Sequence, residues 1–196
     1  MQNNPLDLDK NKSCVIVGNG PSLLFQKKGK IIDSFDEIFR FNKFAIKGYE
    51  QFVGSRTTVW CTHGKDQLPT DEEIRPDKVL YIHGDRGDVL YTPQKMWRVP
   101  LNFYYKLRQE IKNETTEKEK SDKLIPSTGI LVILWLLNNV YEKLYIAGFD
   151  NFSKTLSKQH HYWVKKEYTK PFEHDGEWEK SKIISLYKEK KIRFLW

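Results

Sequence analysis

The most constraining feature of this chain is an apolar stretch that runs into turn-forming residues, Ser13 to Leu23 (SCVIVGNGPSL). Val and Ile dominate its first half, which predicts a buried strand, and Gly-Asn-Gly-Pro-Ser predicts a tight turn and a helix start. Glycine lets the backbone approach a ligand closely, Ser22 can cap the helix, and a helix N-terminus attracts an anion. The stretch therefore predicts either a phosphate-sized binding turn, at Gly18, Asn19 and Gly20, or an ordinary corner of an α/β sheet.

Strand and helix patterns alternate along the rest of the 196 residues. This alternation predicts an α/β fold with a single Rossmann-like, doubly wound and mostly parallel sheet. Residues 1–12 are polar and are expected to form a flexible N-terminus, and residues 13–196 a single domain without repeats. Residues 151–173 are polar and aromatic and connect a strand to a helix, which is typical of a lid or binding loop. Strands are expected at 37–42, 57–62, 78–83, 143–150 and 191–196, and helices at 101–112, 130–140 and 174–190.

Two further positions are predicted to lie at the same edge of this sheet as Asn19. Asn42 closes the strand that begins at Glu37, and ligands collect outside the carboxyl ends of parallel strands. The sequence Pro126-Ser-Thr-Gly129 opens a markedly apolar helix that Ser127 or Thr128 can cap, so its N-terminus can hold an anion. The alternative at this second position is a core helix with an ordinary cap.

Composition limits the class of partner. The formal net charge is +7, which suits nucleic acid, anionic lipid or a phosphorylated substrate. Lysines alternate with acids, as in residues 112–123, and the charge is not gathered on one helix with aromatic residues, so nucleic acid ranks last. Cys14 and Cys61 lie in predicted strands outside any metal-binding spacing, which favours buried, reduced thiols. No run has the length of a membrane helix, and we expect a cytoplasmic protein.

Three of the five histidines fall within fifteen residues, and histidine suits proton transfer near neutral pH. A metal site is not expected, because the adjacent His160 and His161 point apart on an extended chain and no nearby residue completes a site. His174 precedes the last predicted helix, whose positive end disfavours the charged imidazole and so favours a general base. Glu179 is placed to turn back toward His174, although an exposed histidine before an acidic helix start has the same pattern.

With these pieces in view, the chain resembles the sialyltransferases: the eukaryotic-type family with four sialylmotifs and, more distantly, a bacterial family of small enzymes. The four motifs occur in the family's order between residues 14 and 179. The long motif matches CVIVGNGPS from Cys14 and IDSFDEIFRFN up to Asn42, the short motif PSTGIL from Pro126 and LYIAGFD up to Asp150, the third HYW from His161, and the very short motif His174 with Glu179.

The resemblance implies a GT-A-like variant of the fold and an inverting, metal-independent transfer of a sugar acid from a CMP-activated donor to a glycan or glycolipid hydroxyl. It implies no cofactor. By position, Asn19 and Asn42 would contact the CMP phosphate and ribose, while Ser127, Thr128 and Gly129 would hold the nucleotide. His161, helped by Tyr162, would stabilise the departing phosphate, and His174 would be the general base. Donors aimed at that phosphate oppose its growing charge.

Departures from the family patterns leave alternatives open. The short motif lacks the cysteine that pairs with the long motif in the eukaryotic-type family, and Thr62 and His63 stand where the bacterial family has an asparagine. The motifs indicate recognition of CMP more clearly than recognition of the sugar. Two alternative functions therefore remain open: a CMP-Kdo-dependent transferase of the same fold, and a non-catalytic CMP-binding accessory protein. The lysines of the lid are either solvated or attract an anionic donor or a glycolipid. The second interpretation predicts a bacterial enzyme of lipopolysaccharide or capsule synthesis in peripheral contact with an anionic inner membrane.

Overall fold

The computed structural model describes residues 6–64, 70, 71, 74–82, 93–116, 118–150, 161–164 and 173–195. Its centre is a seven-stranded sheet in the order β5-β4-β3-β2-β1-β6-β7, and every neighbouring pair is parallel. This confirms the predicted α/β class and parallel sheet. The strands are β1 (Cys14–Val17), β2 (Glu37–Phe41), β3 (Val59–Thr62), β4 (Lys78–Tyr81), β5 (Lys95–Arg98), β6 (Leu144–Ala147) and β7 (Ile192–Phe194).

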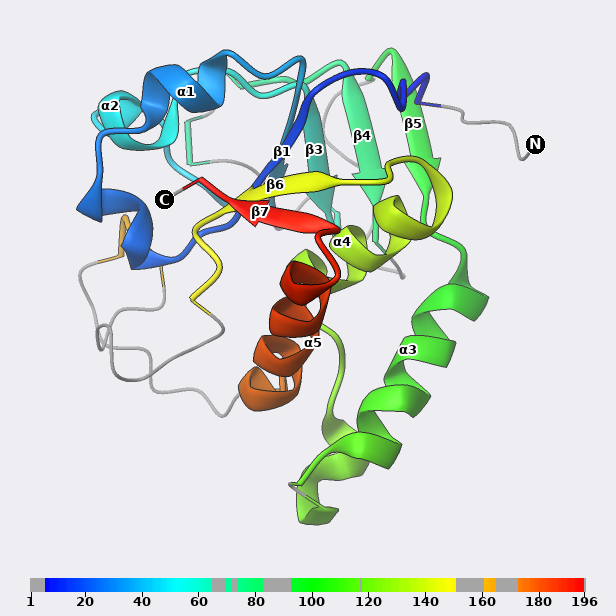
Figure 1. Cartoon of the computed structure of the whole chain (residues 1–196). Helices are drawn as coiled ribbons and strands as arrows, with labels where there is room; N and C mark the ends of the chain where they lie inside the picture. The colour runs from blue at the N-terminus through cyan, green and yellow to red at the C-terminus, as the bar shows by residue number, and fades with distance from the viewer. Residues whose placement is uncertain are drawn as a thin grey trace.

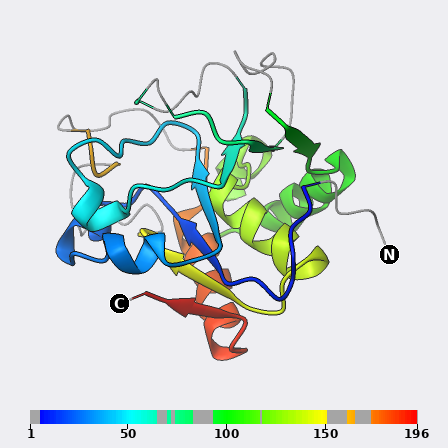
Figure 2. The same ribbon diagram turned by 90° about the horizontal axis from the view of Figure 1, so that it is seen from above.

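Helices cover both faces of the sheet (Figures 1 and 2). On one face lie η1 (Pro21–Phe25), α1 (Gly29–Asp33) and α2 (Glu50–Val53). On the other lie α3 (Leu101–Glu114), α4 (Thr128–Asn139) and α5 (Gly176–Lys188), with the short helix η3 (Lys118–Lys123) beyond α3. Two clusters of buried apolar side chains correspond to these two faces, and α4 contributes most of its length to the larger one. Burial of these clusters from water is the main force that holds the layers together.

The strand order places a topological switch point between β1 and β6. The chain leaves β1 toward β2 on one side, and after β5 it crosses back through α3 and α4 to add β6 on the other side. In open parallel sheets, such a switch point is where ligands generally bind, outside the carboxyl ends of the strands. The Asn19 turn and the start of α4 both lie at this edge, which is why the fold brings them together.

Several elements differ from the sequence-based expectations. Leu6 and Leu8 are 0% and 5% exposed and belong to the core, which the polar composition of residues 1–12 does not predict, whereas residues 9–12 are exposed. β5 was not predicted, because its KMWR sequence lies at an exposed edge of the sheet. The predicted lid, 151–173, lies outside the described residues except for 161–164 and 173.

The two cysteines are buried and free, as predicted. They lie on β1 and β3, which β2 separates, and burial raises the pKa of both thiols. Among the described residues, no helix is long and apolar enough to cross a membrane.

Candidate active site

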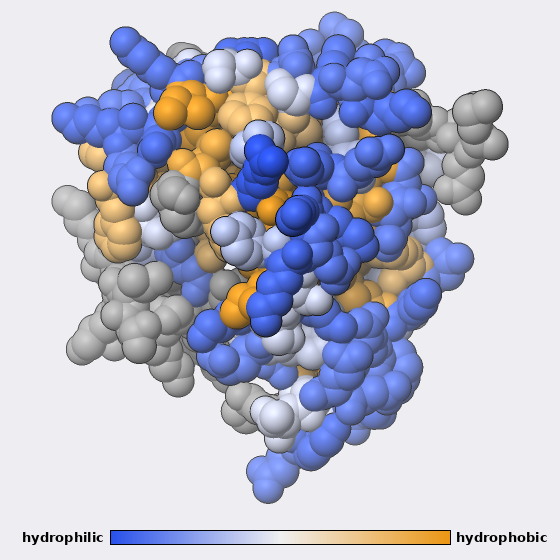
Figure 3. Space-filling view, in the orientation of Figure 1, coloured by the Kyte–Doolittle hydropathy of each residue, from blue (hydrophilic) through white to orange (hydrophobic). Residues whose placement is uncertain are grey.

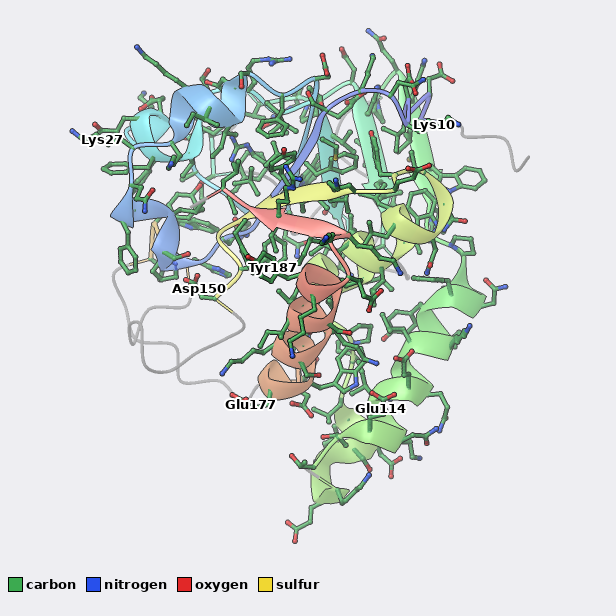
Figure 4. All side chains as sticks on the ribbon, viewed as in Figure 1. Lys10, Lys27, Glu114, Asp150, Glu177 and Tyr187 are labelled. Atoms are coloured by element: carbon green, nitrogen blue, oxygen red, sulfur yellow. The ribbon has the colours of Figure 1, made fainter. Side chains whose placement is uncertain are left out.

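Atoms of the protein itself occupy the space beside the two glycines of the turn after β1. A Cβ on Gly18 would lie 2.4 Å from the carbonyl oxygen of Gly148, and one on Gly20 would lie 2.4 Å from Asp150 Oδ2. These glycines therefore make room for the turn after β6, as in the ordinary-corner alternative, and their contact with a nucleotide stays a prediction. Asp150, labelled in Figure 4, follows β6 by three residues. Its carboxylate accepts a hydrogen bond from the Ser22 amide at 3.0 Å.

This contact corrects the expectation for the first helix start. The helix that follows the turn is the short 3₁₀ helix η1, its N-cap residue is Gly20, and Ser22 lies inside it instead of capping it. Asp150 supplies the negative charge that a helix N-terminus attracts. An incoming phosphate would therefore meet a carboxylate here.

Asn19 fastens the ends of β1 and β2 to each other. Its side-chain amide donates to the carbonyl oxygens of Phe41 at 3.2 Å and Lys43 at 3.0 Å. Its own carbonyl oxygen accepts from the backbone amide of Tyr162 at 3.1 Å. Asn19 thus holds the edge of the sheet and anchors the segment 161–164 to it.

Asn42 stands between β2 and the start of α4. It has a left-handed backbone conformation, φ 46°, a region in which asparagine is the least strained residue after glycine. Cys61 and Trp60 of β3 hold its backbone: its amide donates to the Cys61 carbonyl at 2.8 Å, and the Trp60 indole donates to its carbonyl at 2.9 Å. Its side-chain amide donates to Thr128 Oγ1 at 3.2 Å, whereas its buried Oδ1 has no hydrogen-bond partner among the described residues. A buried acceptor without a partner is costly, so Oδ1 is well suited to accept from a ligand hydroxyl or amine.

His63 is a site residue that the sequence analysis did not assign. It directly follows β3, and its Nε2 lies 2.7 Å from Thr128 Oγ1. The Thr128 side chain is therefore in contact with side chains from the ends of two neighbouring strands. His63 has no assigned role in the sequence-based prediction. Its position at the end of the third predicted strand was the feature of the sequence that could have identified it.

The start of α4 is capped as the sequence predicts, and Ser127 is the capping residue. Its hydroxyl accepts a hydrogen bond from the Ile130 amide at 3.3 Å. Gly129 faces Phe149, whose ring would lie 2.6 Å from an added Cβ. Ser127 and Thr128 are both less than 10% exposed, and the Ser127 amide and hydroxyl already donate to the Glu179 carboxylate, so an anionic ligand at this helix start would have to bind beyond the cap residue.

The prediction that Glu179 faces His174 is wrong. Glu179 is 5% exposed and accepts two hydrogen bonds from Ser127, one from its amide at 2.8 Å and one from its hydroxyl at 2.7 Å. It therefore joins α5 to the start of α4. Burial raises the pKa of the Glu179 carboxyl to about 7, the two Ser127 hydrogen bonds oppose that rise, and Asp175 adds to it.

His174 lies just before α5, on the same side as the start of α4. Its Nδ1 is 2.9 Å from the carbonyl oxygen of Ile125, and the Ile125 amide in turn donates to the Glu173 carbonyl at 2.8 Å. Burial lowers the pKa of the imidazole below its usual value of 6.5, while the Ile125 carbonyl and Glu173 oppose that shift. The predicted direction holds, although burial is the main cause and not the helix dipole. A neutral ring that donates from Nδ1 to a carbonyl carries its lone pair on Nε2, as a general base requires.

The segment 161–164 is anchored by Tyr162. This side chain is 4% exposed, and its hydroxyl donates to the Ala45 carbonyl and accepts from the Ala45 amide at 3.2 Å. Tyr162 therefore anchors the segment, and its predicted contact with the ligand stays a prediction. His161 stacks on Trp163, with ring centroids 4.7 Å apart and planes 6° apart. His160 lies outside the described residues.

Metal-ligating side chains do not gather in the described part of the chain: no three of its His, Cys, Asp and Glu residues are placed to hold one ion. The metal-independent reaction thus stays a prediction. What the arrangement offers is a helix start, a neutral imidazole and amide and hydroxyl groups on one edge of the sheet.

Comparison with known proteins now gives this arrangement a context. A model of "Glycosyltransferase family 29 (sialyltransferase)" matches residues 1–75 and 66–191. The chain is 28% identical over 203 residues to CMP-N-acetylneuraminate-beta-galactosamide-alpha-2,3-sialyltransferase 1 of Gallus gallus, a match that covers 93% of this chain and 58% of the relative. It is 34% identical over 79 residues to the human CMP-N-acetylneuraminate-beta-1,4-galactoside alpha-2,3-sialyltransferase, over 40% of this chain and 21% of that protein.

A crystal structure of a mammalian sialyltransferase shares the fold, with a TM-score of 0.69 at 22% identity over 94% of this chain and 68% of that one. The chain spans 58% of the length of the Gallus gallus relative. The relatives named here are from a bird and from humans, and they lend no support to the bacterial, lipopolysaccharide or capsule setting that the sequence analysis expected.

The Ser127–Glu179 contact predicts a specific pH dependence of stability. The pKa of Glu179 is about 7 in the folded state and 4.5 at its ordinary value, so the folded state holds the proton more tightly. Its contribution is fully present below pH 4.5 and is lost as the pH rises through 7, on the order of 3 kcal/mol in the free energy of unfolding. Glu179→Gln stays neutral and can still pair with Ser127, so it should lack this loss.

Urea unfolding of both proteins between pH 4.5 and 8 measures the effect. The titration of His174, whose lowered pKa has the opposite sign, is present in both and cancels in the difference. The Gln variant should gain stability relative to the native protein as the pH rises. A difference that is constant across this range would contradict the buried, proton-holding carboxyl.

Proposed function

The chain belongs to glycosyltransferase family 29, the sialyltransferases, and on that premise we propose that it transfers sialic acid from a CMP-activated donor to a hydroxyl of a glycan, with inversion and without a metal ion. The observation that carries this proposal is the cluster at the start of α4. There Thr128 joins Asn42 and His63, and the Asn42 Oδ1 has no partner among the described residues. A nucleotide offers sugar hydroxyls for that oxygen and a phosphate for the helix start.

The same cluster suggests how the nucleotide is oriented. Asp150 occupies the helix start after β1 and Glu179 accepts from the α4 cap residue Ser127, so we assign the donor phosphate to the Thr128–Gly129 end of α4, beyond that cap. Thr128 Oγ1 can accept from Asn42 while its hydroxyl hydrogen points to His63, which fixes the rotamer of Thr128 before the donor arrives. Preorganised donors of this kind stabilise developing charge more effectively than water does.

These placements support the following reaction. The bond between the sugar carbon and the CMP phosphate breaks, and the carbon acquires oxocarbenium character. The acceptor oxygen attacks from the opposite face and forms the new bond. His174 Nε2 takes the acceptor proton, His161 stabilises the phosphate, and CMP leaves with the electron pair. A neutral His174 favours this role, and its contact with Ile125 keeps the ring beside α4.

Donor identity is tested by incubating the protein separately with CMP-sialic acid and CMP-Kdo and measuring CMP release, with and without a β-galactoside acceptor. The proposal predicts acceptor-dependent release from CMP-sialic acid at a rate well above that from CMP-Kdo. Faster release from CMP-Kdo would contradict the donor assignment. Binding of CMP without release from either donor would instead indicate the non-catalytic accessory protein.

His174→Asn tests the general base. Asparagine can still donate to the Ile125 carbonyl but cannot take a proton, so kcat should fall by about 10²–10⁴-fold while the Kd for CMP changes little. In the native enzyme kcat/KM should rise with pH through a midpoint below 6.5, because the pKa of His174 is lowered, and then level off. Turnover near the native rate in the variant would exclude this role.

His63 gives a prediction about binding rather than turnover. His63→Ala removes the 2.7 Å partner of Thr128, and loss of one hydrogen bond in the cluster should raise the Kd for CMP about 5–10-fold. His63→Gln can place a polar atom near the original Nε2 and should recover most of that loss. Calorimetric titration with CMP compares the three proteins. Unchanged affinity in the Ala variant would show that His63 does not support the nucleotide site.

A further inference from the structure

One corner of the molecule, formed by η1 and the neighbouring α1, exposes apolar side chains that the core does not use. Phe25, at the end of η1, is 65% exposed, the largest value among the exposed large apolar residues in the described part of the chain. Ile31 of α1 is 45% exposed. Figure 3 shows apolar surface over α1 and toward the β7 edge, where most of the visible surface is hydrophilic.

An apolar hollow of about 120 Å³ opens beside Phe25. It is smaller than the roughly 300–1,000 Å³ of pockets that enclose a drug-sized ligand, so it is better suited to a short apolar group than to a whole small molecule. The hollow is lined by residues of η1, of α1 and its N-cap, of α2 and of the segment just beyond β7: Leu23, Phe25, Lys28, Ile32, Phe52 and Leu195.

Three lysines surround this apolar surface. Lys27, Lys28 and Lys30 fall within four positions, and none forms an ion pair with another described residue. Lys27 projects away from the corner in Figure 4. Of the neighbouring acids, Asp33 is held by hydrogen bonds from Ser55 and Arg56, so it is not directed at these lysines. The corner therefore combines an exposed phenylalanine with an excess of positive charge.

The η1 side of the corner lies at the same edge of the sheet as the candidate active site, whereas α1 leads back to the start of β2 (Figure 1). The hollow is lined by Ala147, the last residue of β6, and by Leu195, just beyond β7. η1 begins at the turn that Asp150 fills. A surface that touches Phe25 would thus lie beside the edge where Asn42 and α4 meet.

We propose that this corner, Phe25 with Lys27, Lys28 and Lys30, docks on the surface of an anionic lipid bilayer. Phe25 inserts among the acyl chains and the lysines contact the lipid phosphates. Stable attachment to a bilayer takes two signals, and an apolar insertion beside a basic cluster supplies both. The role of this membrane contact is to present lipid-linked acceptors to the active-site edge. That role rests on the proposed function, whereas the membrane contact itself does not.

The chain contains a matched control. Tyr187 of α5 is 54% exposed and is followed by Lys188, Lys190 and Lys191, an aromatic residue with three lysines at nearly the same spacing. Lys191 is paired with Glu189 at 2.8 Å, and the hollow beside Phe25 does not include any of these residues. Tyr187 and Lys27 lie on different parts of the molecule in Figure 4. Simple attraction of a basic protein to an anionic surface would depend equally on both sets.

The experiment is co-sedimentation with vesicles of phosphatidylcholine and phosphatidylglycerol (7:3) and with vesicles of phosphatidylcholine alone. The native chain should bind the anionic vesicles and not the neutral ones. Lys27→Gln/Lys28→Gln/Lys30→Gln should weaken binding about 100-fold, from about 1 kcal/mol for each lysine. Phe25→Ser should weaken it at least about 10-fold, because its apolar area no longer enters the bilayer.

The control variants, Tyr187→Ser and Lys188→Gln/Lys190→Gln/Lys191→Gln, should bind within about two-fold of the native chain. Equal losses in the two lysine triples, or no binding of the native chain to anionic vesicles, would overturn the proposal. All of these side chains are exposed or at the rim, and thermal unfolding of each variant checks that the fold is retained. Because sedimentation needs no turnover, failure of the proposed activity would leave this result interpretable.

Discussion

The hydrogen bonds from Ser127 to the buried carboxylate of Glu179 are the contact on which the arrangement of the site depends. They join the first turn of α5 to the start of α4, two helices that are far apart in the sequence. Because His174 immediately precedes α5 and also contacts Ile125, just before α4, the position of the imidazole follows from this junction. A buried carboxylate is costly without such partners, so the junction either forms completely or destabilises the fold. That requirement gives the candidate base a fixed place relative to the helix start.

The parallel sheet supplies the other half of the site through its switch point between β1 and β6. Asn19 and Asn42 follow neighbouring strands, and the side chain of Asn19 ties the two strand ends together. The turn after β6 fills the space above β1, and Asp150 provides the negative charge at η1. Each of the two helix starts thus has a carboxylate from the protein itself beside it, Asp150 at η1 and Glu179 at the α4 cap residue Ser127. What distinguishes the α4 start is the neighbouring Asn42, whose Oδ1 has no partner among the described residues.

Much of this could be predicted from the sequence, because the signals are local. The apolar runs that form β1, β2 and β6, the Ser127 cap and the position of Asn42 at a strand end all depend on periodicity or on residues close in the chain. Contacts between distant residues could not be predicted in the same way. Whether Glu179 faces His174 or Ser127 depends on how α5 packs against α4, and the role of His63 depends on which helix covers β3. The glycines show the same limit, since their permissive backbone is evident in the sequence but the group that occupies the space, Asp150, is not.

We propose that a nucleotide monophosphate binds between Asn42 and the start of α4, and not at the turn after β1. A crystal structure of the protein in complex with CMP would locate the nucleotide. We expect CMP in contact with Asn42 Oδ1 and with the Thr128–Gly129 end of α4, while Asp150 keeps its hydrogen bond to the Ser22 amide. A phosphate bound at the Ser22 amide with the Asp150 carboxylate displaced, or CMP bound away from this edge of the sheet, would contradict it.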